Sequence, residues 1–146
     1  PVSALDVSVQ AQILNLLMDI QESTGLSMMF VTHDLSVVRH IADKIGVMYL
    51  GQMVEVGSTE DLFRRQFHPY TKALLSAVPS VDIRNPSRRV ILKGELTSPI
   101  NPKPGCRFIS RCPYASDKCK DNQQLEEIKE GYFVACCRAR ELNNVE

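Results

Sequence analysis

The sequence predicts an α/β fold followed by a small, loop-rich extension that contains cysteines. Three observations lead to this prediction. Apolar periodicity in residues 8–42 alternates between a helix, a short strand and a second helix. Five of the 8 prolines lie between Pro79 and Pro104, and all 5 cysteines follow them. The charge also changes sign near Pro79, from 5 basic and 8 acidic residues before it to 12 and 9 from there on. These coinciding changes indicate a boundary in the chain.

The composition of the 146 residues is that of a globular protein. It is 44% hydrophobic and 23% charged, which is enough apolar material for a packed core. The 17 basic and 17 acidic residues cancel, which argues against general binding to nucleic acids. Its apolar stretches are far shorter than a bilayer span, and residues 1–20 lack the pattern of a signal peptide. The chain enters a helix pattern almost at once and without an initial Met, so we expect a fragment.

The first elements follow from apolar spacing and capping residues. Residues 8–24 are predicted to form an amphipathic helix. Asp6 is placed to cap its N-terminus, and Gly25 stands where a C-cap glycine belongs. Residues 27–31 form a short apolar run that favours a buried strand of a parallel sheet. A second helix is expected over residues 35–42.

A hairpin and a short helix come next. Residues 45–50 and 52–56 are predicted to form two strands joined by a tight turn at Gly51. Residues 58–61 have the pattern of a capping box, in which a Ser and an acidic residue satisfy the free N–H groups of a helix start. They therefore predict a short helix through Arg65.

One more helix precedes the loop-rich part. Residues 68–70 are predicted to begin it, with Pro69 in its first turn and Pro79 as the stop. Residues 80–105 have a loop composition, with one short strand expected at residues 89–93. The remaining residues are expected to form short segments that carry the cysteines.

His33 is the first residue whose position suggests chemistry. It directly follows the predicted strand, and ligands of open α/β sheets bind at the carboxyl ends of the strands. An imidazole at that edge can donate a hydrogen bond to a phosphate oxygen or orient a water molecule. A structural histidine that ties the loop to neighbouring backbone is the more frequent outcome of such a position, so both interpretations stay open on position alone.

The cysteines form a second candidate site. Their order is Cys106, Cys112, Cys119, Cys136 and Cys137, which places three close thiols and a distant pair on one segment. Thiols so arranged can converge on one metal ion or cluster. The spacing matches neither the zinc ribbons nor the common ferredoxins, so structural zinc, an iron–sulfur cluster and unligated thiols all stay open. Disulfides would need an oxidising compartment, and the number of cysteines is odd.

The charge around the cysteines is compatible with a metal centre. Residues 84–111 contain 7 basic residues and 1 acidic residue. Among them, Arg107 and Arg111 lie between candidate ligands, where cations would stabilise the negative charge of bound thiolates. A solvated basic loop explains the same charge equally well.

Three ordered segments resemble ABC-transporter ATPases. Residues 1–13 are similar to the D-loop region, residues 28–35 to the strand and switch-histidine segment, and residues 51–63 to a hairpin near the end of that domain. The resemblance implies that His33 contacts the γ-phosphate and the attacking water, which are the positioning roles that phosphoryl transfer requires. It also implies that the D-loop reaches across a dimer interface towards the partner's nucleotide. The D-loop residues are Ser3, Ala4, Leu5 and Asp6.

The nucleotide-binding motifs of these ATPases have no counterpart in the sequence. It has no Gly-Lys dipeptide and therefore no Walker A loop, and the signature motif and the Walker B carboxylates are also absent. We therefore expect residues 1–67 to be the C-terminal part of an ABC ATPase domain. ATP and Mg²⁺ would bind in the complete subunit only, and this chain alone is expected to be inactive.

Residues 68–136 resemble the C-terminal extension of oligopeptide/dipeptide (nickel) permease ATP-binding subunits. The similarity is carried by His-Pro-Tyr-Thr at residues 68–71, by Gly-Cys-Arg-Phe and Arg-Cys-Pro-Tyr-Ala within residues 105–115, and by Gly-Tyr-Phe-Val-Ala-Cys at residues 131–136. We therefore assign residues 68–146 to this extension. Some members bind a 4Fe-4S cluster, and the resemblance implies the ligands Cys106, Cys112, Cys119 and Cys136, with zinc as the alternative. Cys137 lies where many members have His, and it is expected to be the spare thiol.

Together the resemblances imply the ATP-hydrolysing subunit of an ABC transporter that imports dipeptides or oligopeptides. Such a subunit would be cytoplasmic and peripheral on the inner face of the cell membrane. It would pair with a second ATPase subunit, as a homodimer or heterodimer, and would contact membrane-spanning permease subunits. An extracytoplasmic peptide-binding protein would be an indirect partner, and no nucleic acid is expected. The alternative is a stand-alone metal-cluster interaction module with no enzymatic role.

Overall fold

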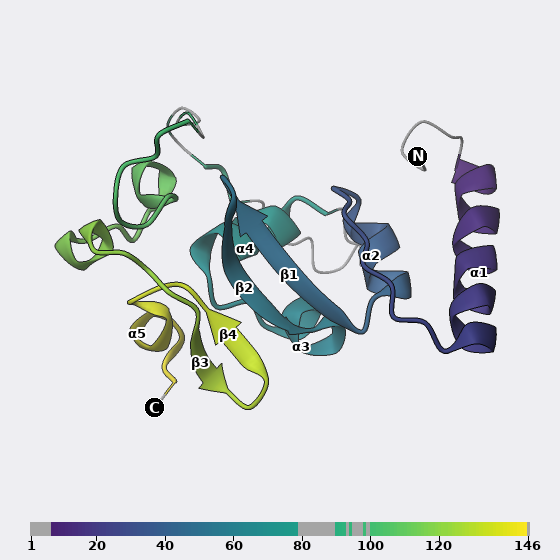
Figure 1. Ribbon diagram of the computed structural model, residues 1–146. Coiled ribbons are helices and arrows are strands. Elements are labelled where there is room, and N and C mark those ends of the chain that lie inside the picture. Colours follow the sequence, from purple (N-terminus) through teal and green to yellow (C-terminus); the bar gives the residue numbers. More distant parts are fainter. Residues whose placement is uncertain (1–6, 79–89, 93, 95–97, 99, 146) are drawn as a thin grey trace, which may run out of the picture. The chain divides into compact units, whose positions relative to one another are not determined.

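The computed structural model describes residues 7–78, 90–92, 94, 98 and 100–145 (Figure 1). The chain divides into two compact units, Pro1–Ile41 and Ala42–Glu146. The first unit contains two helices and the second contains a sheet with helices and short turns around it. Within the described residues, no helix combines the length and the apolar character needed to cross a membrane.

The helices of the first unit agree with the prediction. Helix α1 spans Val7–Thr24 and helix α2 spans Leu35–Ile41. Gly25 adopts a φ of 67°, and its N–H donates a 2.9 Å hydrogen bond to the carbonyl of Gln21. This is the left-handed termination that glycine favours, and it confirms the predicted C-cap. The predicted N-cap, Asp6, lies outside the described residues.

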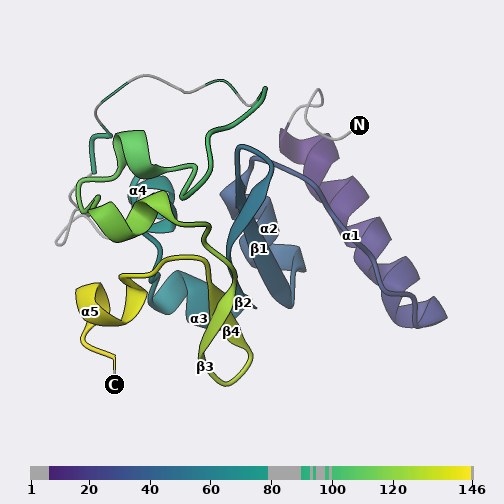
Figure 2. The same ribbon diagram turned by 60° about the vertical axis from the view of Figure 1, so that its left-hand side comes forward.

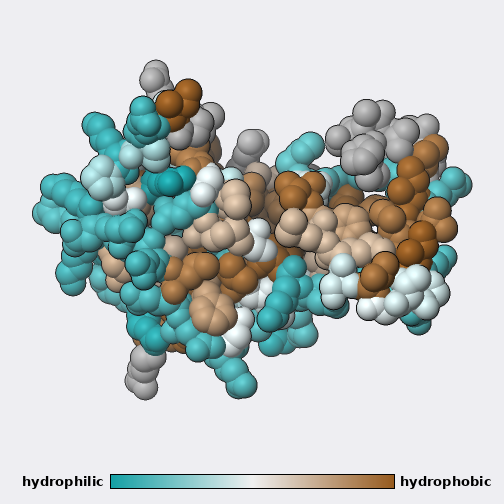
Figure 3. Space-filling view, viewed as in Figure 1, coloured by the Kyte–Doolittle hydropathy of each residue, from teal (hydrophilic) through white to brown (hydrophobic). Residues whose placement is uncertain are grey.

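The predicted strand at residues 27–31 does not form. Residues 26–32 have no regular structure, and the side chains of Met29 and Val31 are 90% and 92% exposed. A strand needs neighbours to satisfy its backbone N–H and C=O groups, and residues 7–41 contain no other extended segment to pair with. The expected parallel sheet is therefore also wrong for the part of the chain described. Figure 3 shows brown, apolar surface over this unit.

The second unit is built on a four-stranded antiparallel sheet with the strand order β1-β2-β4-β3. The strands are β1 (Lys44–Tyr49), β2 (Gln52–Ser58), β3 (Glu126–Lys129) and β4 (Tyr132–Val134). The first two form the predicted hairpin, whereas β3 and β4 were not predicted. Val56 of β2 pairs with Phe133 of β4, so the C-terminal segment completes the sheet that the hairpin begins.

The turns of both hairpins rely on left-handed backbone. Leu50 and Gly51 have φ values of 47° and 75°, as a tight two-residue turn between antiparallel strands requires. The Arg107 guanidinium donates a hydrogen bond to the carbonyl of Leu50 and so joins this turn to the cysteine-bearing segment. Gly131 has a φ of 68° in the second hairpin. A glycine after Glu130, between two short segments that contain apolar residues, is a pattern from which this hairpin could have been predicted.

One face of the sheet is covered by two helices. Buried and exposed residues alternate along β1, and the buried ones are Ile45, Val47 and Tyr49. Helix α3 (Thr59–Arg64) contacts β1 and β2, and helix α4 (Pro69–Ser76) contacts β2. This packing places the core of the unit between the sheet and the two helices (Figure 2).

Both helices begin as predicted. The Ser58 hydroxyl accepts a 3.2 Å hydrogen bond from the N–H of Asp61, which confirms Ser58 as the N-cap of α3. At the start of α4, the His68 Nδ1 atom accepts a 3.1 Å hydrogen bond from the N–H of Tyr70, and Pro69 occupies the first turn. The predicted stop, Pro79, lies outside the described residues.

The segment after α4 contains few regular elements, as expected for a loop-rich extension. Its short elements are the 3-10 turns η2 (Ile109–Arg111) and η3 (Asp117–Lys120) and the helix α5 (Ala139–Asn143). Residues 90–92 have no regular structure, which contradicts the short strand expected there, and residues 89 and 93 lie outside the described residues. The assignment of residues 68–146 to a separate extension stays a prediction, because the sheet takes strands from both sides of residue 67.

Candidate functional site: a cluster of cysteines

Gly105 brings the first cysteine against the third. The backbone of Gly105 has a φ of 96°, and a Cβ atom there would lie 2.6 Å from the carbonyl oxygen of Lys120 and 2.7 Å from that of Cys119. Only glycine permits this approach of two backbones. The approach allows the N–H of Cys106 to donate a 2.8 Å hydrogen bond to the carbonyl of Cys119.

Phe108 anchors the turn between Cys106 and Cys112. Its side chain is 1% exposed, and its ring packs edge-on against Tyr49 at 5.2 Å and tilted against Tyr70 at 5.5 Å between centroids. These aromatic contacts fix η2 to the first hairpin and to α4. The positions of the first two cysteines are thereby tied to the sheet.

Gln123 joins the loop of Cys119 to the last cysteine. Its Nε2 atom donates to the carbonyls of Asp121, at 2.7 Å, and Lys118, at 3.2 Å. Its Oε1 atom accepts a 2.8 Å hydrogen bond from the N–H of Cys137. The Cys119 and Cys137 sulfur atoms lie 3.9 Å apart. Gln123 was not predicted as a site residue, because a lone glutamine belongs to no recognisable motif.

Cys136 is positioned by the sheet. The preceding residue, Ala135, donates a 2.9 Å hydrogen bond to the carbonyl of Val54 in β2, directly after β4 ends. The following turn is closed by a 3.0 Å hydrogen bond from the N–H of Ala139 to the carbonyl of Cys136. The distant pair of the sequence is thus brought back to the three close cysteines through the pairing of β2 with β4.

A buried carboxylate connects the elements that carry the cysteines. Glu55 of β2 is fully buried, and its oxygens accept hydrogen bonds from the N–H of Phe67 at 2.6 Å, the N–H of His68 at 3.1 Å and the hydroxyl of Tyr132 at 2.7 Å. Burial raises the pKa of Glu55, while these hydrogen bonds act in the opposite direction. One side chain therefore connects β2, the start of α4 and β4.

The five thiols influence one another electrostatically. Burial raises the pKa of Cys106 and Cys112, and the charge of nearby Cys119 adds to both shifts. Burial also raises the pKa of Cys136 to about 12 and that of Cys137 to about 11, again with contributions from neighbouring thiols. In a metal-free protein at neutral pH these four thiols are therefore protonated.

Cys119 differs from the others. Partial burial acts to raise its pKa, but hydrogen bonds from the Ser116 backbone and hydroxyl and from Cys137, together with the charge of Arg138, lower it below the ordinary value. The Arg138 guanidinium is held in place by two hydrogen bonds to the Glu141 carboxylate, at 2.6 and 3.1 Å. By contrast, Arg107, which the sequence suggested as a cation for the cluster, is engaged with the hairpin turn.

The distances limit what the cysteines can hold in this arrangement. Sulfur ligands of one tetrahedral ion, with metal–sulfur bonds of about 2.3 Å, lie about 3.8 Å apart. The pair Cys119 and Cys137 meets this spacing at 3.9 Å. No group of three or more His, Cys, Asp or Glu side chains in the described part of the chain is placed to hold a single metal ion. All four predicted ligands nevertheless gather in one region.

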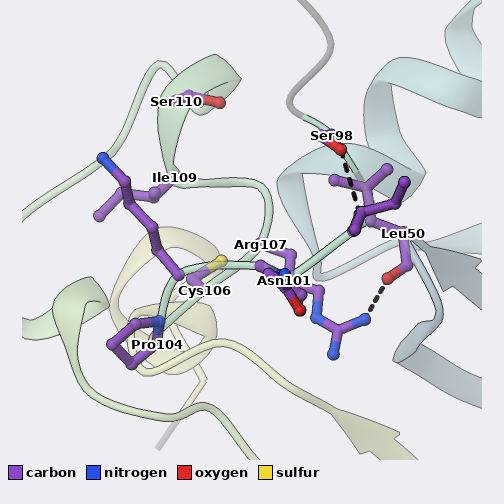
Figure 4. A pocket seen from close by; sticks show the side chains of 11 residues that line it. Leu50, Ser98, Asn101, Pro104, Cys106, Arg107, Ile109 and Ser110 are labelled. Carbon is purple, nitrogen blue, oxygen red and sulfur yellow. Dashed lines mark hydrogen bonds between the residues drawn. The ribbon is translucent and has the colours of Figure 1, made fainter.

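A cavity of about 410 Å³ gives access to the edge of the cluster (Figure 4). Its wall includes Cys106, the apolar side chains of Leu50, Ile100 and Ile109, and Arg107. Figure 4 shows the Cys106 sulfur beside the cavity and the Arg107 guanidinium directed at the carbonyl of Leu50. The first of the predicted ligands can therefore be reached from solvent.

The predicted catalytic residue lies in the other unit. His33 is exposed and stands two residues before α2. The next residue, Asp34, caps that helix, because its Oδ1 atom accepts hydrogen bonds from the N–H groups of Ser36 at 2.9 Å and Val37 at 3.3 Å. The predicted D-loop, Ser3, Ala4, Leu5 and Asp6, lies outside the described residues.

Comparison with known proteins identifies the family. Residues 54–119 match the family model described as "Oligopeptide/dipeptide transporter, C-terminal region". The dipeptide transport ATP-binding protein DppF of Haemophilus influenzae is 56% identical over 137 residues, which cover 93% of this chain and 42% of the relative. The oligopeptide transport ATP-binding protein AppF of Bacillus subtilis is 52% identical over 141 residues, with the same shares covered.

Over nearly its whole length the chain is similar to part of the oligopeptide and dipeptide transport ATP-binding proteins, and residues 54–119 match the C-terminal region that the family model describes. It spans less than half the length of the family relatives it matches. The family match begins within the first hairpin at residue 54 and ends at Cys119, so it includes Glu55, Gly105 and three of the five cysteines. The expectation drawn from the residue motifs is thereby confirmed at the level of the family.

Proposed function

We propose that this chain works in the ATP-binding subunit of an ABC transporter that imports dipeptides or oligopeptides. The observation that carries this proposal is 52–56% identity to peptide-transport ATP-binding proteins over at least 93% of the chain. The bound nucleotide, ATP with Mg²⁺, supplies the free energy for uptake in the complete subunit. A stand-alone metal-cluster module is not supported, because the relatives align with nearly the whole chain.

The proposed setting follows from this function. The subunit is cytoplasmic and peripheral on the inner face of the cell membrane, where it pairs with a second ATPase subunit. The pair contacts membrane-spanning permease subunits, and an extracytoplasmic peptide-binding protein delivers the cargo to those subunits. Residues 1–67 form the end of the ATPase domain in this proposal, and residues 68–146 form its extension.

Uptake of labelled peptides tests the proposal. Cells that lack the gene are expected to lose uptake of a radiolabelled dipeptide or tripeptide, and a plasmid copy is expected to restore it. Uptake of a radiolabelled free amino acid serves as the control and should not change. If uptake of neither peptide depends on the gene, the proposed cargo class is wrong.

His33 has the proposed role of holding the attacking water against the γ-phosphate. Its exposed imidazole precedes a helix whose start is fixed by Asp34, which suits a side chain that must hold one position. The D-loop residues Ser3, Ala4, Leu5 and Asp6 have the proposed role of crossing the dimer interface. Both roles are positioning roles, and they require the complete nucleotide site of the paired subunits.

We also propose that Cys106, Cys112, Cys119 and Cys136 hold a 4Fe-4S cluster. The gathering of the five thiols in one region supports this proposal, and so does a glycine at residue 105 that no larger residue can replace. The cluster would supply a rigid, charged cross-link within a segment that has few regular elements.

Metal analysis of anaerobically purified protein tests the cluster. Iron and acid-labile sulfide are expected, and a Ser substitution at any one of the four cysteines should remove both. The variant Cys137→Ser is the matched control and should retain them. Zinc at one equivalent without iron would replace the cluster by a structural zinc site. Absence of both metals would contradict any metal-binding role of these cysteines.

A further inference from the structure

The Cys119 and Cys137 sulfur atoms are in contact at 3.9 Å. A disulfide requires a sulfur–sulfur bond of about 2.05 Å, and side-chain rotation together with small backbone shifts covers such a difference. Cys137 is exposed to solvent, whereas Cys119 is 6% exposed. Cys137 is therefore accessible to reagents in solution, and the buried Cys119 is in contact with it.

Buried hydrogen bonds enforce this contact. The side chain of Gln123 is 8% exposed and holds the backbone on both sides of Cys119 through the carbonyls of Lys118 and Asp121. The same side chain holds the N–H of Cys137 at 2.8 Å. Three hydrogen bonds from one buried amide therefore fix the separation of the two cysteine backbones. In addition, the N–H of Cys106 donates to the carbonyl of Cys119 from the opposite side.

We propose that Cys119 and Cys137 form a reversible disulfide when the metal-free protein meets a small-molecule disulfide such as oxidised glutathione. The exposed Cys137 thiol loses its proton as it attacks one sulfur of the oxidant, and it forms a mixed disulfide and releases one molecule of the reduced thiol. The Cys119 thiolate then attacks the Cys137 sulfur and expels the second molecule. Two protein thiols are oxidised, one small disulfide is reduced to two thiols, and the protons of the protein thiols pass to those products.

Geometry disfavours the competing pair of neighbours. The peptide bond between Cys136 and Cys137 is trans, so their Cα atoms lie about 3.8 Å apart. Disulfides usually join Cα atoms that are about 4.4 to 6.8 Å apart. A bond between these two adjacent residues would therefore be strained, whereas Cys119 approaches Cys137 from a separate segment.

The disulfide goes beyond peptide import and does not depend on it. Cys119 is also a proposed cluster ligand, so the disulfide and the cluster exclude each other. When no metal is bound, the disulfide is an alternative cross-link. It joins η3 to the turn before α5, two segments that the proposed cluster would also join. Disulfides that do form in reducing compartments are usually transient ones of this kind, which respond to oxidation.

The test uses the full chain, reduced in the presence of a chelator and then equilibrated with defined ratios of oxidised and reduced glutathione at pH 7. After acid quenching and alkylation, peptide mapping by mass spectrometry should find one internal disulfide, between Cys119 and Cys137. The variant Cys137→Ser should lose this species, and Cys136→Ser, one residue away, should retain it. Only mixed disulfides with glutathione, or a different internal pair in the wild-type chain, would overturn the proposal.

A second variant tests the role of the buried amide. Gln123→Leu removes all three hydrogen bonds, so the equilibrium constant for closing the disulfide should fall about tenfold. An unchanged constant in a folded variant, judged by far-ultraviolet circular dichroism, would show that Gln123 does not position the pair. The mapping of the wild-type chain does not depend on this variant, so the proposal can be refuted even if Gln123→Leu fails to fold.

Discussion

Glu55 connects three separate elements of the second unit, which are β2, the start of α4 and β4. Its carboxylate accepts hydrogen bonds from two backbone N–H groups and from the hydroxyl of Tyr132, all in the interior. Glu55→Ala leaves these donors without their acceptor, so the free energy of unfolding should fall by about 3 kcal/mol or more. Glu60→Ala is the matched control, because Glu60 is exposed, and it should change stability by less than about 0.5 kcal/mol. Urea unfolding of both variants makes the comparison, and equal losses would contradict the role given to Glu55.

His68 makes stability depend on pH. Burial lowers the pKa of His68 to about 4, from the ordinary 6.5. Between these values the unfolded chain binds a proton that the folded chain does not, so stability falls as the pH decreases from 6.5 towards 4. The loss attributable to His68 should reach about 2 kcal/mol at pH 5. The raised pKa of Glu55 acts in the opposite direction, because its folded form takes up a proton more readily.

The variant His68→Asn isolates this effect. Asn is also a favourable residue at a helix start, so it preserves the cap of α4 while removing the titrating group. Between pH 7 and pH 5 the wild-type chain should lose more stability than the variant in urea unfolding experiments. Parallel losses in the two proteins would show that His68 is not the group responsible.

At the scale of residues, the sequence pointed to the candidate thiols but not to the residues that position them, and the metal-binding role of the thiols stays a prediction. The thiols and their gathering followed from residue type and family motif. Gln123 and the burial of Glu55 did not, because a single polar residue gives no periodic signal. Their roles depend on which segments lie side by side, and that is set by the pairing of β2 with β4.

At the scale of elements, Gly105 controls how the cysteine-bearing turns meet. Gly105→Ala would place a Cβ atom 2.6 Å from a backbone oxygen, which cannot move away like a side chain. Gly25→Ala is the control, because Gly25 also has a positive φ but has nothing within 4 Å of the added atom. The control should cost about 1 kcal/mol, and Gly105→Ala should cost at least about twice that. Thermal unfolding of both variants measures the difference, and equal costs would contradict the close approach.

Elements with local signals were predicted well. Both helices of the first unit, the first hairpin and the caps of α3 and α4 follow from spacing and from residues at their ends. The strand at residues 27–31 failed because a strand is stabilised by its neighbours, which its own sequence does not supply. The second hairpin was missed because its strands are short. β3 has a single apolar residue among charged ones and β4 has only apolar residues, so neither shows the alternation typical of a strand.

At the scale of the whole molecule, family membership rests on sequence and the arrangement of the cysteines rests on structure. The sequence motifs of residues 51–63 and 68–136 were sufficient to predict the family that the comparisons identify. The four predicted ligands come from turns and from the end of β4, and the antiparallel sheet returns Cys136 to the other three. This convergence is a property of the fold that residue spacing alone could not establish.

The central claim is that this chain takes part in ATP-driven peptide import, with His33 at the reacting phosphate. The most direct measurement is the initial rate of radiolabelled dipeptide uptake in cells whose only copy of the gene carries His33→Ala. We expect a decrease of at least about tenfold at unchanged protein level, because the group that positions the attacking water is lost. His40→Ala, at an exposed position in the last turn of α2, should leave uptake near the wild-type rate. Uptake by the His33→Ala cells at the wild-type rate would contradict the claim.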